Sequence, residues 1–164
     1  MQVRPAELND VPALHAIYAH HVQTGLGTFE TVPPALSEFQ ARYVAVVQAG
    51  FPYLVAEAEG RVHGYAYADH YRPRAAYRET IEDSVYVASD ATGRGIGQAL
   101  LTELIQRCAR LGMKQMLAFI GDSQNAASIG AHRACGFVYV GVLTSVGRKF
   151  ERWVDVVIMQ RALA

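Results

Sequence analysis

The apolar positions of the chain follow two spacings, one typical of helices and one typical of strands. Over 11–22 and again over 39–47 they recur at helical spacing, which predicts two amphipathic helices. The same spacing continues over 100–111, before Gly112, and a short helix is expected over 125–135. The loop between the first two helices is rich in glycine and proline, so it should form no regular element.

Short apolar runs between these helices predict the strands of a sheet. The runs lie at 1–4, 53–58, 62–71, 81–88, 114–120, 137–143 and 153–159. Only Glu59-Gly60-Arg61 separates the second run from the third, which predicts a hairpin. Because helices and strands alternate without a linker or a repeat, we expect an α/β (α+β) fold. Its mixed sheet should carry helices on both faces, in one domain over 1–164.

Composition narrows the class of protein. The chain has 164 residues, of which 51% are hydrophobic, so it can bury a sizeable core. Its 15 basic and 15 acidic residues cancel, which disfavours nucleic acid or a membrane surface as a partner. The chain begins without an apolar leader, and no apolar run approaches the ~20 residues that span a bilayer. We expect a cytoplasmic protein.

The two cysteines carry no sign of metal or disulfide chemistry. Cys108 and Cys135 both fall in predicted helices and form no Cys-x-x-Cys pair. No cluster of histidine and cysteine stands near them to complete a metal site. Both are therefore interpreted as buried, apolar side chains, and no metal is expected.

A glycine-rich segment over 90–98 lies between a predicted strand and a predicted helix. Glycines let the backbone turn tightly, and the free N–H groups at the start of a helix attract phosphate. The segment is not a P-loop, because no Gly-Lys is followed by Ser or Thr, and it fits a Rossmann fingerprint poorly. It predicts an anion site, although a glycine loop unrelated to any ligand stays open at this point.

Two motifs are similar to the cofactor motifs of the GNAT superfamily of N-acetyltransferases. The first is the pyrophosphate loop Arg/Gln-x-x-Gly-x-Gly/Ala, which Gly95 and Gly97 match while Thr92 replaces the usual Arg or Gln. The second is Asn-x-x-Ala/Ser-x-x-x-Tyr-x-x-x-Gly-Phe, which begins here at Asn125 and has His132 in the tyrosine position. The resemblance covers roughly residues 1–162 and implies a mostly antiparallel sheet of about seven strands, splayed in the middle, with about four helices.

The resemblance implies acetyl-CoA as co-substrate and marks the residues expected to bind it. Its pantetheine arm should lie along one strand and its pyrophosphate on the glycine loop. The expected cofactor-binding residues are Val85, Tyr86, Val87, Gly93, Arg94, Gly95, Ile96, Gly97, Gln98, Asn125 and Ser128. Two alternatives stay open: Tyr86 can simply pack in the sheet, and Asn125 can be a helix N-cap.

Direct transfer of an acetyl group to an amine needs a base and a proton for the departing thiolate. Glu82 matches the position of the family's catalytic carboxylate, so we expect it to take the ammonium proton directly or through a water. His132 has a reference pKa near neutrality and can protonate the thiolate. The alternatives are a solvated carboxylate at a strand end and a histidine that only bonds a neighbour.

Within the superfamily the chain looks similar to the phosphinothricin and methionine sulfoximine acetyltransferases. The stretches that carry this likeness are 28–31, 82–87, the helix with His132, and 147–155, where Glu151 replaces an expected glycine. Such enzymes act on free amino acids whose side chain ends in an oxidised sulfur or phosphorus group. They are usually homodimers, so a homodimer is expected here.

Substrate-binding candidates follow from residue type and position. Arg72 and Arg74, with Tyr77, precede the Glu82 strand, and a guanidinium there can pair with a substrate carboxylate. Phe29 and Glu30 should form the opposite wall. The alternative functions are acetylation of another amine, such as a protein N-terminus or an arsenic-containing amino acid, and a catalytically silent acyl-CoA-binding module.

Overall fold

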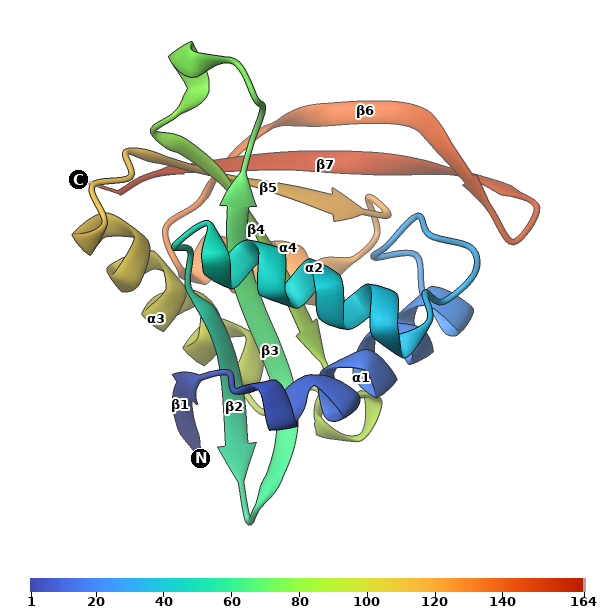
Figure 1. The fold of residues 1–164 in the computed structure, drawn as a ribbon. Coiled ribbons are helices and arrows are strands. Elements are labelled where there is room, and N and C mark those ends of the chain that lie inside the picture. Colours follow the sequence, from blue (N-terminus) through green and yellow to red (C-terminus); the bar gives the residue numbers. More distant parts are fainter. Residues whose placement is uncertain (164) are drawn as a thin grey trace.

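A computed structural model describes residues 1–163, and a single seven-stranded sheet runs through its centre (Figure 1). The strands are β1 Gln2–Pro5, β2 Tyr53–Ala58, β3 Arg61–His70, β4 Thr80–Val87, β5 Gln115–Gly121, β6 Val138–Lys149 and β7 Arg152–Ala162. The helices are α1 Val11–Thr24, α2 Leu36–Gln48, α3 Ile96–Arg110 and α4 Ala126–Ala134. The strand order is β1-β2-β3-β4-β5-β7-β6. The predicted mixed sheet with helices is confirmed.

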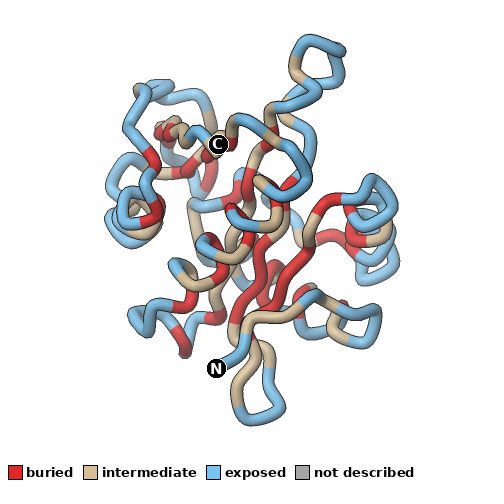
Figure 2. Tube along the Cα trace, turned by 90° about the vertical axis from the view of Figure 1, so that its left-hand side faces the viewer, coloured by how far each residue is buried: buried red, intermediate tan, exposed pale blue. Residues whose placement is uncertain are grey.

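The helices cover both faces of the sheet, because neighbouring residues of a strand point to opposite sides. On β3, a side-chain atom added at Gly64 would meet Ile96 and Leu100 of α3. The next residue, Tyr65, instead sets its ring edge-on against Phe39 of α2. Helices α1 and α2 therefore share one face, while α3 lies on the other (Figure 1). Figure 2 shows that the buried residues concentrate along the strands and the inner sides of the helices.

The apolar stripes predicted for the helices pack against the sheet with two exceptions. The stripe of α1 is buried throughout, and so is that of α3 up to Cys108, whereas Leu111 follows the end of that helix at Arg110 and is 49% exposed. On α2 the residues Phe39, Tyr43 and Val46 are buried, whereas Val47 is 44% exposed. The prediction that Val47 lies on the buried face was wrong, because each residue of a helix is turned by about 100° from its neighbour. Val46 already occupies the inner position.

Most strand ends differ from the predictions by one residue, whereas β7 ends at Ala162, past the predicted Met159, and β6 shows the largest difference. The β2–β3 hairpin turns on Glu59 and Gly60, at φ 54° and 72°, while Arg61 already belongs to β3. Strand β6 extends to Lys149, six residues beyond its predicted end at Leu143, because the ladder to β7 continues through polar residues. In the turn that follows, Glu151 has φ 59°, a left-handed conformation that glycine adopts at little cost.

The sheet opens between β4 and β5, its one parallel pair. These strands pair only from Thr80–Glu82 to Gln115–Leu117. Beyond that point β4 continues along β3 to Val87, and β5 continues along β7 to Gly121. The splay implied by the resemblance is therefore present, and it leaves an unpaired edge of β4 facing a gap.

Candidate active site

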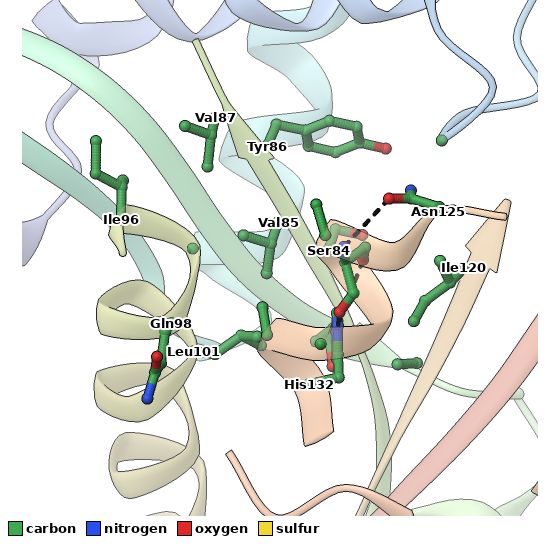
Figure 3. Close-up of a pocket in the computed structure, with 18 of the residues that line it drawn as sticks. Ser84, Val85, Tyr86, Val87, Ile96, Gln98, Leu101, Ile120, Asn125 and His132 are labelled. Carbon is green, nitrogen blue, oxygen red and sulfur yellow. Dashed lines mark hydrogen bonds and ion pairs between the residues drawn. The ribbon is translucent and has the colours of Figure 1, made fainter. Parts of the chain in front are cut away.

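A cleft of about 700 Å³ lies at the splay of the sheet. Its walls come from the end of β4, the start of α3, the end of β5 and α4. In Figure 3, Val85 of β4 lies between Leu101 on α3 and His132 on α4. Every residue predicted to bind the cofactor lines this cleft except Arg94, which is exposed on the glycine loop.

The glycine loop forms an anion cradle at one end of the cleft. Gly93 and Gly95 have φ of 74° and 75°, and α3 begins at Ile96, directly after Gly95. Because the N-cap residue is a glycine, it has no side chain to bond the N–H groups of the first helical turn. A side-chain carbon at Gly97 would meet only Val85 and Val87, at 3.9 and 3.8 Å. A helix start with free N–H groups beside a glycine turn has the features of an anion site.

The edge of β4 provides backbone groups along the cleft. Residues 85–87 pair with β3 on one side, and their other edge faces the gap. The His21 Nε2 lies 2.7 Å from the Val87 carbonyl oxygen and donates to it. His21 also lines the cleft, and its burial lowers its pKa despite the Val87 bond. The sequence reasoning missed His21, since its place in α1 carries no motif.

Asn125 is the N-cap of α4, which was the simpler of its two expected roles, and it also lines the cleft. Its side-chain oxygen accepts a hydrogen bond from the Ser128 N–H at 3.1 Å, which caps α4. Because Asn125 also lines the cleft, the same side chain can cap the helix and contact a ligand. Tyr86 likewise packs in an aromatic cluster, 5.2 Å from the ring of Tyr18 and 5.3 Å from that of Tyr65, while lining the cleft.

Glu82 lies where β4 and β5 part. In register it stands opposite Asp69 of β3 and Leu117 of β5. Burial, followed by the charges of Asp83 and Asp69, raises the pKa of Glu82 to about 7. A carboxylate that titrates near neutrality, in a cleft, has the properties of a general base.

His132 is buried at the floor of the cleft, at 4% exposure. Its Nε2 lies 3.1 Å from Asp83 Oδ1, and its Nδ1 lies 2.7 Å from the Ser128 carbonyl oxygen. Burial alone would lower the pKa of His132, but Asp83 and the Ser128 carbonyl outweigh it and raise that pKa. The sequence reasoning missed Asp83. Strand alternation was the available signal, because it places Asp83 on the same buried face as Ile81.

The arginines proposed for substrate binding do not line the cleft. Arg72 and Arg74 are exposed in the β3–β4 loop. The loop nevertheless packs on the cleft wall through aromatic rings: Tyr77 sets its edge on Tyr71, which stacks on Phe119 at 5.9 Å between ring centres. Phe119 lines the cleft. Both arginines therefore lie on a loop joined to the wall rather than in it.

Phe29 and Glu30, in the loop after α1, were both expected to form one wall of the substrate site, but their side chains have different surroundings. The ring of Phe29 lies against Gly147, where a side-chain carbon would overlap it, and near Gly121, where such a carbon would come within 3.2 Å of it. Glu30 accepts hydrogen bonds from Arg42 at 2.8 and 2.9 Å and from the Tyr18 hydroxyl. The Glu30 carboxylate is therefore engaged within the protein and holds this loop to α2.

Residues 1–163 show no metal centre, since they contain no group of three or more histidine, cysteine, aspartate or glutamate side chains placed to hold a metal ion. Both cysteines are buried free thiols, as predicted. None of the helices in this range has the length and apolarity needed to cross a membrane.

Comparison with known proteins decides the family. The sequence profile of the Acetyltransferase (GNAT) family matches residues 14–137, well over half of the chain. The chain belongs to the GNAT acetyltransferase family. The resemblance inferred from the two motifs is thus confirmed.

Relatives of this acetyltransferase include phosphinothricin and methionine sulfoximine N-acetyltransferases. The chain is 58% identical to a phosphinothricin N-acetyltransferase of Alcaligenes faecalis, over 98% of its own length and 82% of the relative. It is 42% identical to an L-methionine sulfoximine/L-methionine sulfone acetyltransferase of Pseudomonas aeruginosa, over 96% and 92%. A crystal structure of a phosphinothricin acetyltransferase from Sinorhizobium meliloti, in complex with acetyl-CoA, superposes with a TM-score of 0.96 at 43% identity, over 99% and 88%. The chain is an acetyl-CoA-dependent N-acetyltransferase.

Proposed function

We propose that this acetyltransferase moves the acetyl group of acetyl-CoA to the α-amino group of a small amino acid analogue of the phosphinothricin, methionine sulfoximine or methionine sulfone type. The observation that carries the proposal is Glu82, a base with a pKa near 7 at the splay where the two substrates must meet. The named relatives supply the substrate class.

The cleft residues divide the binding of acetyl-CoA among three elements. The N–H groups at the start of α3 hold the pyrophosphate, where the positive end of the helix dipole faces it. The open edge of β4 at 85–87 binds the pantetheine arm through its backbone. Asn125 and Ser128, at the start of α4, close the other side. An amide of β4 beside the splay polarises the thioester oxygen.

Glu82 and His132 then handle the proton and the charge. Glu82 takes a proton from the substrate ammonium, and the freed amine attacks the thioester carbon while the carbon–sulfur bond breaks. The attacking nitrogen gives up a second proton as the amide forms, the departing thiolate takes up one proton and leaves as the thiol, and Glu82 releases its proton to water, which balances the reaction. Both ring nitrogens of His132 already bond acceptors, so we do not assign direct proton donation to this side chain. We propose instead that its positive charge stabilises the thiolate.

The amino acid would bind on the side of Glu82 that faces α1 and the β3–β4 loop. Phe29, held between two glycines, offers a ring for the aliphatic stem of the substrate. Arg72 and Arg74 on the neighbouring loop supply guanidinium groups for its carboxylate, and Tyr77 anchors that loop through Tyr71. Glu30 supports this wall from behind through Arg42 instead of touching the substrate.

The test is an assay of thiol release from acetyl-CoA with a panel of amines. The panel contains phosphinothricin, methionine sulfoximine, methionine sulfone, ordinary amino acids and a peptide with a free N-terminal alanine. Turnover confined to the three oxidised analogues is expected. Turnover of the peptide alone would reassign the enzyme to protein N-termini, and binding of acetyl-CoA without turnover of any amine would contradict the proposal.

We also propose a homodimer in which β6 is covered by a second copy. Strand β6 ends the sheet order and exposes large apolar side chains that water would otherwise surround. Those exposed by more than half are Val138, Tyr139, Val140 and Val146, with Phe150 and Trp153 beside them. An edge strand with this many exposed apolar residues favours pairing with another chain.

The cellular role that fits this chemistry is detoxification. Acetylation removes the positive charge of the α-amino group, so the product no longer resembles an amino acid. A cytoplasmic location suits an enzyme that consumes acetyl-CoA. Expression of the gene in a phosphinothricin-sensitive bacterium should restore growth on that compound, whereas the Glu82→Gln variant should not.

A further inference from the structure

Asp83 is a buried carboxylate to which neither the family motifs nor the proposed reaction gives a role. It lies in the middle of β4 at 7% exposure and contributes to the floor of the cleft. Its Oδ1 bonds His132 Nε2 at 3.1 Å. Its Oδ2 is buried and has no hydrogen-bond partner within residues 1–163. A half-satisfied buried carboxylate is costly, so its retention calls for a reason.

The partners of His132 define its charge. The Ser128 carbonyl oxygen can only accept, so Nδ1 must carry a hydrogen. Nε2 faces Asp83, and when that carboxyl is ionised it can only accept, so Nε2 then carries the second hydrogen. In that state His132 is an imidazolium paired with Asp83, and the ring of Phe137 stands edge-on to it at 5.0 Å. A buried pair of this kind fixes geometry more than it stabilises the fold.

This pair connects the two elements that hold the cofactor. Asp83 lies on β4, two residues before the edge that should bind the pantetheine arm, and His132 lies on α4, whose first residues close the opposite side of the cleft. Asp83 also follows Glu82 directly in the chain. Their side chains point to opposite faces of the sheet, yet the charge of Asp83 is felt at Glu82 and helps to raise its pKa.

We propose that Asp83 is a positioning residue with two actions: it holds His132 as a fixed cation that joins α4 to β4, and its negative charge favours proton uptake by Glu82. The second action rests on the proposed function of Glu82 as the base, whereas the first does not. Together they couple the floor of the cofactor cleft to the proton-accepting group on the other side of the sheet.

The other charged and titratable groups near Asp83 and Glu82 do not account for the two actions assigned to Asp83. Asp69 on β3 also faces Glu82, while its neighbour on β5 is the apolar Leu117. The Cys108 thiol of α3 approaches Asp83, but burial, followed by the charge of Asp83, raises its pKa to about 12, so it stays neutral. Within residues 1–163, His132 is the cation that makes a salt bridge to Asp83.

The test compares Asp83→Asn with the matched variant Asp69→Asn in the full-length protein. Asparagine keeps the size of Asp83 and an oxygen that accepts from His132, but it removes the charge. NMR titration of the histidine ring signals should show the proton affinity of His132 falling at least about tenfold, that is, by one pKa unit. Carboxyl-carbon NMR should show the pKa of Glu82 falling as well. Asp69→Asn should lower the pKa of Glu82 and leave His132 unchanged.

Each of the two NMR titrations can overturn one of the two actions proposed for Asp83. An unchanged His132 titration in Asp83→Asn would refute the first action, and an unchanged Glu82 titration would refute the second. If that variant does not fold, the wild-type protein still decides the first action: a His132 ring that is neutral at pH 7 contradicts it. Both titrations are measured without substrate. A failure of the proposed function, which would show as no turnover in the amine panel, can therefore be told apart from a failure of the role proposed for Asp83.

Discussion

Two glutamates near the cleft show how surroundings set the charge of identical side chains. Arg42 donates two hydrogen bonds to Glu30 and lowers its pKa, although burial opposes this. Glu82 has carboxylates as neighbours instead, and burial together with their charges raises its pKa to about 7. Only the second glutamate can exchange a proton near neutral pH, which separates the catalytic candidate from the structural one.

Replacing Glu82 by glutamine should lower kcat by about 10²- to 10⁴-fold, because general-base catalysis typically contributes that much. In the wild type, kcat/KM should rise with pH and level off above about 7, as Glu82 loses its proton. The variant should lose that limb while its acetyl-CoA affinity stays the same. Steady-state kinetics over a pH series measure both. Glu103→Gln, on the outer part of α3, is the control and should leave the profile intact.

The rise in pH that should increase activity through Glu82 should decrease the stability of the fold. A glutamate whose pKa is raised in the folded state disfavours folding once it ionises, so stability falls as the pH rises from its usual range, near 4.5, through about 7. Glu82→Gln should therefore unfold at a higher temperature than the wild type above neutral pH, and the two should converge in acid. Thermal unfolding at several pH values tests this; equal melting at every pH would contradict it.

At the scale of elements, a left-handed backbone occurs both at the start of α3 and in the turn after β6. Gly95 turns the chain so that the first N–H groups of α3 face the cleft, and its lack of a side chain keeps them free. Glu151 adopts the same left-handed region in the β6–β7 turn without being a glycine. In the first case the glycine leaves the N–H groups of α3 without a side-chain partner, whereas in the second the two central residues of a hairpin turn, Phe150 and Glu151, both need a positive φ.

A negative charge at the start of α3 should repel the pyrophosphate. Gly97→Asp is expected to weaken acetyl-CoA binding at least about tenfold, because the new carboxylate occupies the positive end of the helix dipole. Gly97→Ala should cost little, as its methyl group meets Val85 and Val87 at ordinary contact distances. Gln106→Asp places the same charge far along the helix and is the control. Calorimetric titration gives the affinities, and an unchanged value for Gly97→Asp would refute the cradle.

Restoring the glycine in the β6–β7 turn should stabilise the protein. A left-handed φ costs a non-glycine residue roughly 1–2 kcal/mol, part of which the greater freedom of glycine in the unfolded chain cancels. Glu151→Gly should therefore raise the free energy of unfolding by up to about 1 kcal/mol. Chemical denaturation measures the change. Glu103→Gly, within a helix, should destabilise the protein by about the same amount, and a loss in both variants would contradict the strain argument.

At the scale of the whole molecule, β6 is the edge of the sheet at which we propose the dimer contact. Val140→Lys places a charge in the exposed apolar stretch of β6 and should weaken dimer formation at least tenfold, on the order of what one desolvated charge costs. Val32→Lys, at a loop position that is 74% exposed, should leave the dimer intact. Sedimentation velocity over a concentration series tests both, and a wild-type monomer at every concentration would refute the homodimer.

Local pattern in the sequence determined most of the fold. The stripes of α1 and α3 and the β2–β3 hairpin follow from spacing and turn chemistry, which act between residues close in the chain. The two cofactor motifs were also readable, because each is a contiguous stretch on one element. The family and the elements that carry its cofactor motifs could therefore be predicted from the sequence.

Tertiary structure decided what depends on residues far apart in the chain. The pairing of Asp83 with His132 spans 49 positions, and the register that brings Asp69 beside Glu82 depends on how β3 meets β4. The engagement of Glu30 by Arg42 likewise needs α2 to pack over the loop. No local pattern encodes these contacts, since burial and charge at a site come from every element that closes around it. The sequence by itself determined the elements and the family, and the packing of those elements determined which acidic side chain has the proton affinity of a base.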